Sequence, residues 1–189
     1  MVATVSIYLD TGGTDANPGT STDTDALGPP TIRFKAADNP TIDANNKLVI
    51  PAAGIIYSYR KAIYLLCDDA DSHVLNNFKF YTDGNNGLGT GVDVYVGLQF
   101  PTKNSGSSAG YEVADNQTEM VADTALTSSA SIFDYTSGAA LTVSCSEGSN
   151  QIDDTGETIN YLFTQMNVAS TASPGDTPNE GFTIAYDEA

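Results

Sequence analysis

The sequence has no tryptophan, a single histidine and only two cysteines among its 189 residues. One histidine, His73, leaves little choice of base for nucleophilic catalysis, and no serine lies in a Gly-x-Ser-x-Gly setting. Paired carboxylates of the glycosidase kind stay open, because spatial pairs are not visible in a sequence and 24 acidic residues supply many accidental ones. We therefore expect a protein that is not an enzyme.

Long hydrophobic runs are also absent, since no apolar stretch approaches the roughly 20 residues of a transmembrane helix. The first 13 residues, MVATVSIYLDTGG, lack the charged and apolar regions of a secretory signal. We therefore expect synthesis in a cytoplasm.

In a cytoplasm Cys67 and Cys145, which both lie in strand-like runs, are expected as two buried thiols, with one disulfide bridge as the alternative.

Positive charge is scarce, and the formal net charge is −17. Every Lys and Arg precedes residue 104, so the remainder of the chain carries acidic residues and no Lys or Arg. Binding to a nucleic-acid backbone needs clustered cations, so we expect no nucleic-acid partner. An acidic surface keeps copies soluble, or it binds cations or a basic partner. The seven cations are Arg33, Lys35, Lys47, Arg60, Lys61, Lys79 and Lys103.

The residues that are present favour β-structure. Three runs rich in Val, Ile, Tyr and Phe, at Ile55–Cys67, Val74–Tyr81 and Val92–Phe100, predict three strands. The third run alternates most strictly, which indicates a sheet with one wet face. Gly, Asn and Asp are concentrated between the second and third runs, so we predict a β-hairpin with a long tip at 82–91. The first run is apolar on both faces and is expected in the middle of a sandwich.

Shorter runs complete the fold prediction. We expect further strands at 2–9, 31–36, 47–50, 111–113, 141–145, 159–168 and 182–186, and one or two helical turns within 121–132. Eight to ten strands joined by long loops predict an all-β, two-sheet antiparallel sandwich that is jelly-roll-like. A single domain is expected over 1–189, with an acidic loop or arm at 10–30 and a C-terminal extension from about residue 169.

Two acidic segments suggest metal binding. Asp10, Asp15, Asp23 and Asp25 raise a calcium hypothesis, but their spacing does not fit an EF-hand loop, and an ordinary acidic loop is the simpler interpretation. The second segment has three aspartates before the only histidine, without the further His or Cys that a metal site needs. We expect a solvated turn there. The residues of this turn are Asp68, Asp69, Asp71 and His73.

Four segments, in order, are TIRFKAADN, YSYRKAIYL, NNFKFYTDGNNGLGTGVDVYVG and INYLFTQMNVASTASPGDTPNEGFTIAYDEA. Together they resemble structural proteins from the virions of tailed bacteriophages and related viruses. The resemblance implies a non-enzymatic β-sandwich that repeats many times on the particle, as a capsid decoration protein or a head or tail component. It implies a protein made in the host cytoplasm and located in the virion. The partners so implied are the major capsid protein, other virion proteins and copies of the chain, without nucleic acid, membrane or cofactor.

A decoration role needs loops and arms that reach neighbours. We expect arms at 10–30 and after Pro174, and a head-to-tail contact between the cation-bearing and cation-free halves of adjacent subunits. The interface residues predicted on this basis are Arg33, Lys35, Arg60, Lys61, Asp23, Asp25, Tyr186, Asp187 and Glu188.

The alternative function is a carbohydrate-binding β-sandwich on a surface fibre or a cell surface. Exposed tyrosines beside an Asp/Asn-rich loop could stack on sugar rings. The stacking candidates are Tyr57, Tyr59, Tyr64, Tyr81 and Tyr95.

Overall fold

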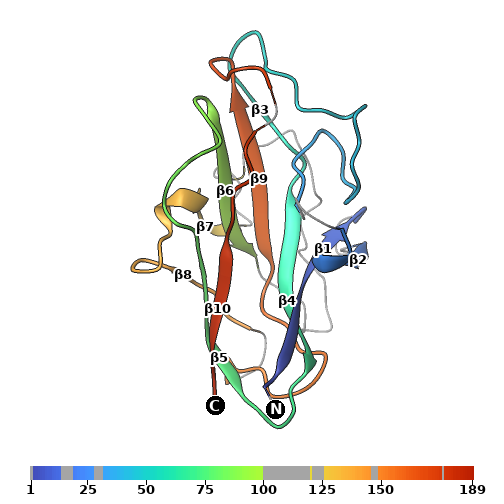
Figure 1. Ribbon diagram of the computed structural model, residues 1–189, viewed down its shortest axis with the longest axis vertical. Coiled ribbons are helices and arrows are strands. Elements are labelled where there is room, and N and C mark those ends of the chain that lie inside the picture. Colours follow the sequence, from blue (N-terminus) through green and yellow to red (C-terminus); the bar gives the residue numbers. More distant parts are fainter. Residues whose placement is uncertain are drawn as a thin grey trace.

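The computed structural model describes residues 2–13, 19–27, 32–99, 120, 126–145, 149–175 and 177–189, and these residues form ten strands and two short 3-10 helices (Figure 1). The strands are β1 (Thr4–Thr11), β2 (Thr20–Asp23), β3 (Ile55–Tyr57), β4 (Lys61–Asp69), β5 (Leu75–Tyr81), β6 (Val92–Gln99), β7 (Leu126–Ser131), β8 (Leu141–Thr142), β9 (Leu162–Ala169) and β10 (Thr183–Glu188). The helices are η1 (Thr24–Leu27) and η4 (Ile132–Asp134).

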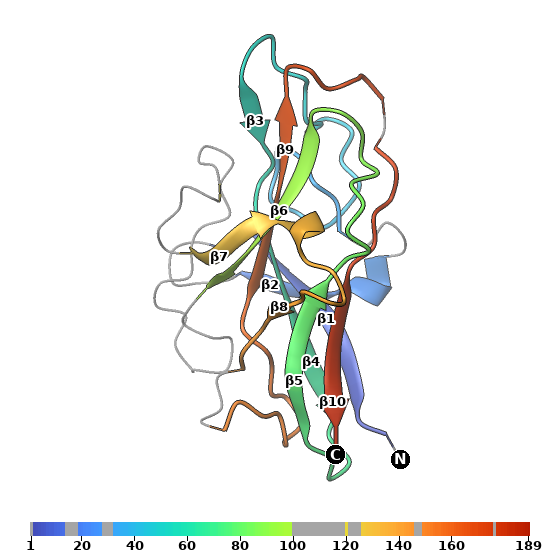
Figure 2. The same ribbon diagram turned by 90° about the vertical axis from the view of Figure 1, so that its left-hand side faces the viewer.

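The strands form two antiparallel sheets, which Figure 2 shows from the side. The large sheet has seven strands in the order β2-β1-β4-β9-β6-β7, with β3 also paired to β9, and the small sheet has the order β10-β5-β8. From β4 to β10 the chain passes repeatedly between the sheets, which is the jelly-roll-like feature of the topology. The predicted all-β, two-sheet antiparallel sandwich is confirmed.

The predicted hairpin between the second and third central runs is wrong. β5 belongs to the small sheet and β6 to the large one, so the segment 82–91 connects two layers rather than two paired strands. Stacked sheets lie about 10 Å apart, and a connection of this length spans that gap easily. Hairpin loops are usually two to five residues long. The length of the Gly/Asn-rich segment was therefore the sign of a crossover.

The predicted strand 55–67 is divided into β3 and β4, and both lie along β9. Ser58 causes the interruption. Its backbone N–H donates to the Met166 carbonyl at 2.8 Å, and its hydroxyl accepts from the Met166 N–H at 3.0 Å. Tyr59 then turns its N–H away to the carbonyl of Lys35, at 3.0 Å. The break directs the chain toward the loop that carries Lys35.

Several local predictions need correction. Segment 10–30 was expected to be a loop, but β1 extends to Thr11 and β2 pairs back on it. Helical turns were expected within 121–132, but 126–131 form β7, whose Thr and Ser residues suit an edge strand, and Ile132 begins η4; 121–125 lie outside the described residues. The segments 32–36 and 47–50 form no strand. The strand expected at 111–113 lies outside the described residues.

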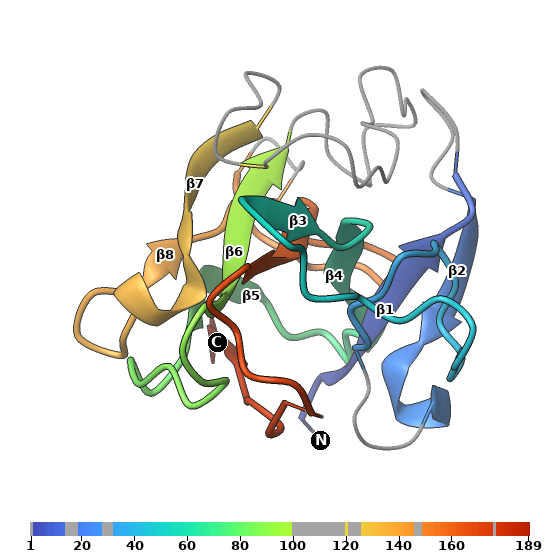
Figure 3. The same ribbon diagram turned by 90° about the horizontal axis from the view of Figure 1, so that it is seen from above.

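The core includes both faces of the central strands. Every residue from Leu162 to Val168 of β9 is buried, as are Lys61–Leu65 of β4. On β6 the predicted alternation is confirmed, because Val92, Val94, Val96 and Leu98 are buried. Figure 1 shows β4 and β9 inside the large sheet, between β1 and β6, and Figure 3 shows the molecule along the perpendicular direction. The expectation that the first central run occupies the middle of the sandwich holds for β4.

The two cysteines are both buried free thiols, as predicted. Burial raises the pKa of the Cys67 thiol, which also lies near Asp68. Low thiolate content and lack of exposure make such a thiol unreactive.

Candidate interaction surface

Residues 32–54 form an irregular loop beside the large sheet, and two buried lysines hold it in place. Lys35 is 4% exposed, and its ammonium donates to the side-chain oxygen of Asn39 and to the carbonyl of Thr41. Burial lowers the pKa of Lys35, against the opposing effect of Asp43. The loop is thus folded around its own cation.

Lys61 on β4 is fully buried and holds the same loop from the sheet side. Its ammonium donates to the Ala37 carbonyl at 3.2 Å and pairs with the Asp38 carboxylate at 3.3 Å. The other carboxylate oxygen of Asp38 accepts the N–H of Gly12 at 2.6 Å, which connects the loop to the end of β1. Burial lowers the pKa of Lys61, and Asp38 opposes that effect.

The predicted interface cations therefore lie mostly inside the chain. Lys35, Arg60 and Lys61 are all buried, so their charges are not presented to a partner. Arg33 is half-buried, and its guanidinium donates to the Pro40 carbonyl at 3.4 Å. The exposed cation of this region is Lys47, which the sequence-based prediction did not include.

Large apolar side chains are exposed on this loop and at the start of β3. Ile42 is 79% exposed, Val49 71% and Ile55 47%. Ile55 begins β3, and no described strand other than β9 pairs with β3. We call these three residues together with Lys47 the β3 surface. Large solvent-exposed apolar side chains, and strand edges that no described strand covers, are typical features of contact surfaces.

A groove of about 420 Å³ opens at the end of the small sheet, and we call it the small-sheet groove. Its carboxylates are Asp83 and Glu180, and its aromatic residues are Tyr81 and Phe182. The backbone N–H of Asn85, and then its side chain, hold the pKa of Asp83 below its usual range, so this carboxylate is ionised at neutral pH. The remaining lining residues are Thr82, Ser137, Gly181 and Thr183.

Sequence reasoning missed this groove because its residues come from three separate segments. Residues 81–83 end β5, Ser137 follows η4, and residues 180–183 lead into β10. None of the three carries a motif. The pairing of β10 with β5 and the bridge between Thr82 and Thr136 bring them together.

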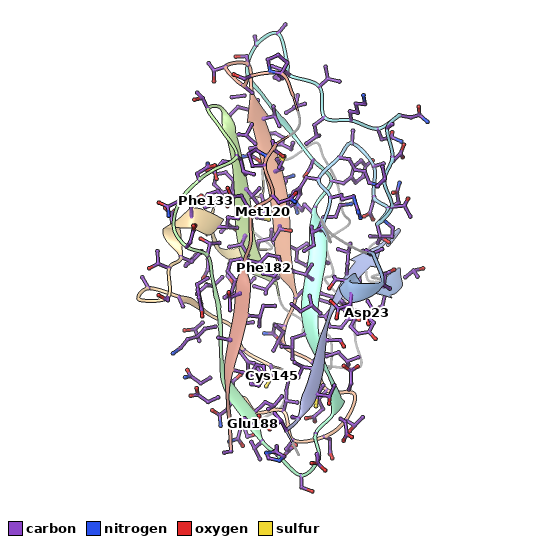
Figure 4. The ribbon with its side chains drawn as sticks, viewed as in Figure 1. Asp23, Met120, Phe133, Cys145, Phe182 and Glu188 are labelled. Carbon is purple, nitrogen blue, oxygen red and sulfur yellow. The ribbon has the colours of Figure 1, made fainter. Side chains whose placement is uncertain are left out.

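The C-terminal residues predicted at the interface make contacts within the chain. Glu188 accepts the N–H of Ala3 at 2.7 Å and lies 3.0 Å from Nδ1 of His73. Asp187 accepts from the side chain of Asn77 at 2.8 Å. Tyr186 packs against Phe78, with ring centroids 6.3 Å apart, and its pKa is raised by burial. Glu188 and both termini lie at one end of the molecule (Figures 1 and 4).

The calcium hypothesis placed Asp10 in an acidic loop, but Asp10 is buried on β1. Its carboxylate accepts from Ser21 at 2.5 Å and from the hydroxyl of Tyr161 at 2.8 Å. Asp23 accepts the backbone N–H of Asp25 at 2.9 Å, at the start of η1. Asp15 lies outside the described residues. The described aspartates therefore serve local structure and do not converge on one point.

The aspartates before His73 also make contacts within the chain. Asp68 accepts from the hydroxyl of Ser6 at 2.6 Å, and Asp69 accepts the N–H of Asp71 at 3.1 Å. The three carboxyl groups that do converge are those of Asp153, Asp154 and Glu157, whose oxygens lie within 4.8 Å of one another. Glu157 closes this turn by accepting both aspartate N–H groups, at 2.8 and 3.0 Å.

Two of the stacking candidates have clear places in the fold. Tyr64 is buried in an aromatic row on the large sheet, 5.7 Å from Tyr8 and 5.7 Å from Tyr161 between ring centroids. Tyr81 borders the small-sheet groove, and the other three candidates, Tyr57, Tyr59 and Tyr95, are half-buried.

Comparison with known proteins gave no relative: no family model, no curated protein and no solved structure matches this chain. Among the described residues, no helix has the length and apolar character needed to cross a membrane.

Proposed function

We propose that this chain is a non-enzymatic structural protein of a virus particle, a capsid decoration protein that binds the shell and neighbouring copies. The β3 surface is the observation that carries the proposal. Ile42, Val49 and Ile55 are exposed, and no described strand other than β9 pairs with β3. Exposed apolar area of this kind is stabilised when a partner covers it. The virus particle itself is inferred from the sequence resemblance.

The rest of the fold suits a protein that works by attachment. Both chain ends are tied into the sandwich, through the Glu188 contact with Ala3 and the mutual hydrogen bonds of Val74 and Ala189, each 3.0 Å. Rigid subunits lose little conformational entropy when they bind, and contacts that are modest one by one add up over many copies.

Protein composition of purified particles tests the proposal. Quantitative mass spectrometry of virions from the virus that encodes this chain should find it at a stoichiometry comparable to that of the main shell protein. Its absence from purified particles would contradict the proposal, as would turnover of a substrate by the isolated protein.

Variants then test the surface. Val49→Lys combined with Ile55→Lys should reduce recovery of the protein on particles in a rebinding assay, because both charges enter the apolar contact. Val2→Lys is the matched control, since Val2 is 68% exposed but lies outside the β3 surface. If the double variant and the control rebind to particles equally, the β3 surface is not the surface that attaches the protein to the particle.

Carbohydrate binding is the second candidate function, and the small-sheet groove supports it. Tyr81 and Phe182 offer aromatic rings beside the carboxylates of Asp83 and Glu180, a combination that can stack on a sugar and accept hydrogen bonds from its hydroxyl groups. A glycan array discriminates between the two functions, because a decoration protein should bind no glycan.

A further inference from the structure

The small-sheet groove is acidic and has no basic residue in its lining. Asp83 and Glu180 contribute two carboxylates, and the other lining residues are neutral. Asp83 is held in its ionised form by the N–H of Asn85 at 2.9 Å. No described residue donates a hydrogen bond to the carboxylate of Glu180, which is half-buried above Gly87. A cationic group would therefore be attracted to the groove, and an anionic one repelled.

The aromatic residues favour a cation with an apolar stem. Tyr81 and Phe182 line the groove, and Phe182 is fixed by its contact with Phe80 at 5.4 Å between ring centroids. A lysine side chain combines an ammonium group, which carboxylates and aromatic faces attract, with a methylene stem that packs against rings.

The described part of the chain displays one such side chain. Among the described cations, Lys47 is exposed, whereas Lys35, Arg60 and Lys61 are buried and Arg33 and Lys79 are half-buried. Lys47 stands two residues before Val49 on the β3 surface. A cation beside an exposed apolar side chain complements a groove that combines carboxylates with rings.

The groove and Lys47 lie on different sides of the molecule. In Figures 1 and 3 the loop 32–54 extends beside β1 and β2, and the small sheet lies on the other side. The groove is formed by β5, β10 and the residue after η4, while Lys47 belongs to the loop that precedes β3 of the large sheet.

We propose that Lys47 of one copy binds in the small-sheet groove of a second copy, with Val49 packed at its rim. The contact joins two different surfaces, so it is heterologous and produces a ring if the rotation closes, or a filament if it does not. This inference rests on the proposed function, because it identifies the neighbouring molecule that a decoration protein would bind as a second copy of the chain. It does not involve attachment to the shell.

Sedimentation velocity of the purified full chain over a concentration series tests the contact. The wild type should self-associate, and association should weaken as salt rises, because part of the attraction is between charges. Lys47→Glu should weaken association by at least about tenfold, the effect expected of a charge pair at a contact. Glu180→Lys should do the same from the other side of the contact.

A charge-swap variant makes the test specific. Lys47→Glu combined with Glu180→Lys keeps the net charge of the wild type and restores an opposite-charge pair, so it should associate more tightly than either single variant. Lys47→Glu combined with Asp153→Lys has the same net charge but leaves the groove acidic, and it should stay as weak as Lys47→Glu alone. Asp153 is exposed in the turn before Glu157, at the opposite end of β5 from the groove.

Several results would overturn the inference: a wild type that remains monomeric at every concentration, single variants that associate normally, or a charge swap without rescue. Binding of a glycan in the groove, blocked by Glu180→Lys while self-association is unchanged, would also overturn it. Each of these results leaves particle stoichiometry untouched, so failure of this contact can be distinguished from failure of the decoration role.

Discussion

Among single residues, one group of polar side chains in the large sheet forms a hydrogen-bonded network around the buried Asp10. The carboxylate of Asp10 accepts from Ser21 and Tyr161, and Ser21 also bonds to the hydroxyl of Tyr64. Burial of Tyr64 raises its pKa to about 12, because the phenolate would lose its hydration and would lie near Asp10. The network holds β1, β2, β4 and β9 together by side chains as well as by backbone.

The raised pKa of Tyr64 predicts a loss of stability at high pH. The unfolded chain releases this proton near pH 10, whereas the folded chain retains it until about pH 12, so folding stability is present below 10 and falls as the pH rises to 12. The lowered pKa values of Lys35 and Lys61 act in the opposite direction as the pH rises through the ordinary lysine pKa of 10.5, but they do so equally in the wild type and in a Tyr64 variant. Urea unfolding at several pH values above 10.5 should show a smaller decline for Tyr64→Phe than for the wild type. An equal decline in both proteins would contradict this assignment.

The two thiols give a second prediction at this scale. Cys67 is 0% exposed and Cys145 is 7% exposed, so a water-soluble thiol reagent should label neither at pH 8 while the chain is folded. Addition of denaturant should expose two thiols per chain to the reagent. Fast labelling of Cys67 in the folded protein would show that the large sheet opens locally around β4.

At the scale of elements, the loop 32–54 shows how a polar segment is ordered without regular structure. Hydrogen bonds within the loop fix its course: the Ala36 N–H donates to the Asn46 carbonyl at 2.9 Å, and the Asn46 side chain donates to the Asp43 carboxylate at 2.6 Å. The ammonium groups of Lys35 and Lys61 also donate hydrogen bonds to the loop. These contacts place Lys47 and Val49 at the surface. The β3 surface therefore depends on cations that are not exposed themselves.

The buried pair of Lys61 and Asp38 predicts an unequal effect of two substitutions. Asp38→Ala removes one partner and leaves an ammonium group buried without its counter-charge, which should lower the free energy of unfolding by about 3 kcal/mol. Lys61→Met keeps the volume and removes the charge, so it should cost less. Urea denaturation of both variants measures the difference. A larger loss for Lys61→Met than for Asp38→Ala would contradict the assigned role of the pair.

The sequence predicts the strands of the core well but not their partners. Alternation identifies β6, and apolar runs identify β4, β5 and β9. These strands are predictable because the residue pattern of a single strand shows which of its side chains are buried. Which sheet a strand joins depends on long-range contacts, and so β5 and β6 were paired wrongly. Lys35 and Lys61 were expected at an interface because charge normally avoids the interior, and only the loop folded over them makes their burial possible.

At the scale of the whole molecule, strands from both halves of the chain alternate in the large sheet. β4 from the first half pairs with β9 from the second half, which in turn pairs with β6, and the small sheet likewise combines β5 with β8 and β10. Neither half of the sequence has a core that could form without the other. The single domain expected over residues 1–189 stays a prediction, and this interleaving suggests how to test it.

A single cooperative unfolding transition is the corresponding prediction. Far-ultraviolet circular dichroism, which reports on strands, and tyrosine fluorescence, which reports on packing, should give the same midpoint in urea. Two separated transitions would indicate that the sheets unfold independently. Limited proteolysis offers a control, because cleavage within the loop 32–54 should leave the two parts associated through β1, β4 and β9.

The adjacency of the chain ends determines how the protein responds to mechanical load. Ala3 is bonded to Glu188, yet β1 belongs to one sheet and β10 to the other. A force that pulls the ends apart would break this contact first and then peel each terminal strand from its neighbour one hydrogen bond at a time. A force along the long axis would shear whole ladders together and meet far greater resistance. The fold should therefore resist a load along its long axis better than a load applied between Ala3 and Glu188.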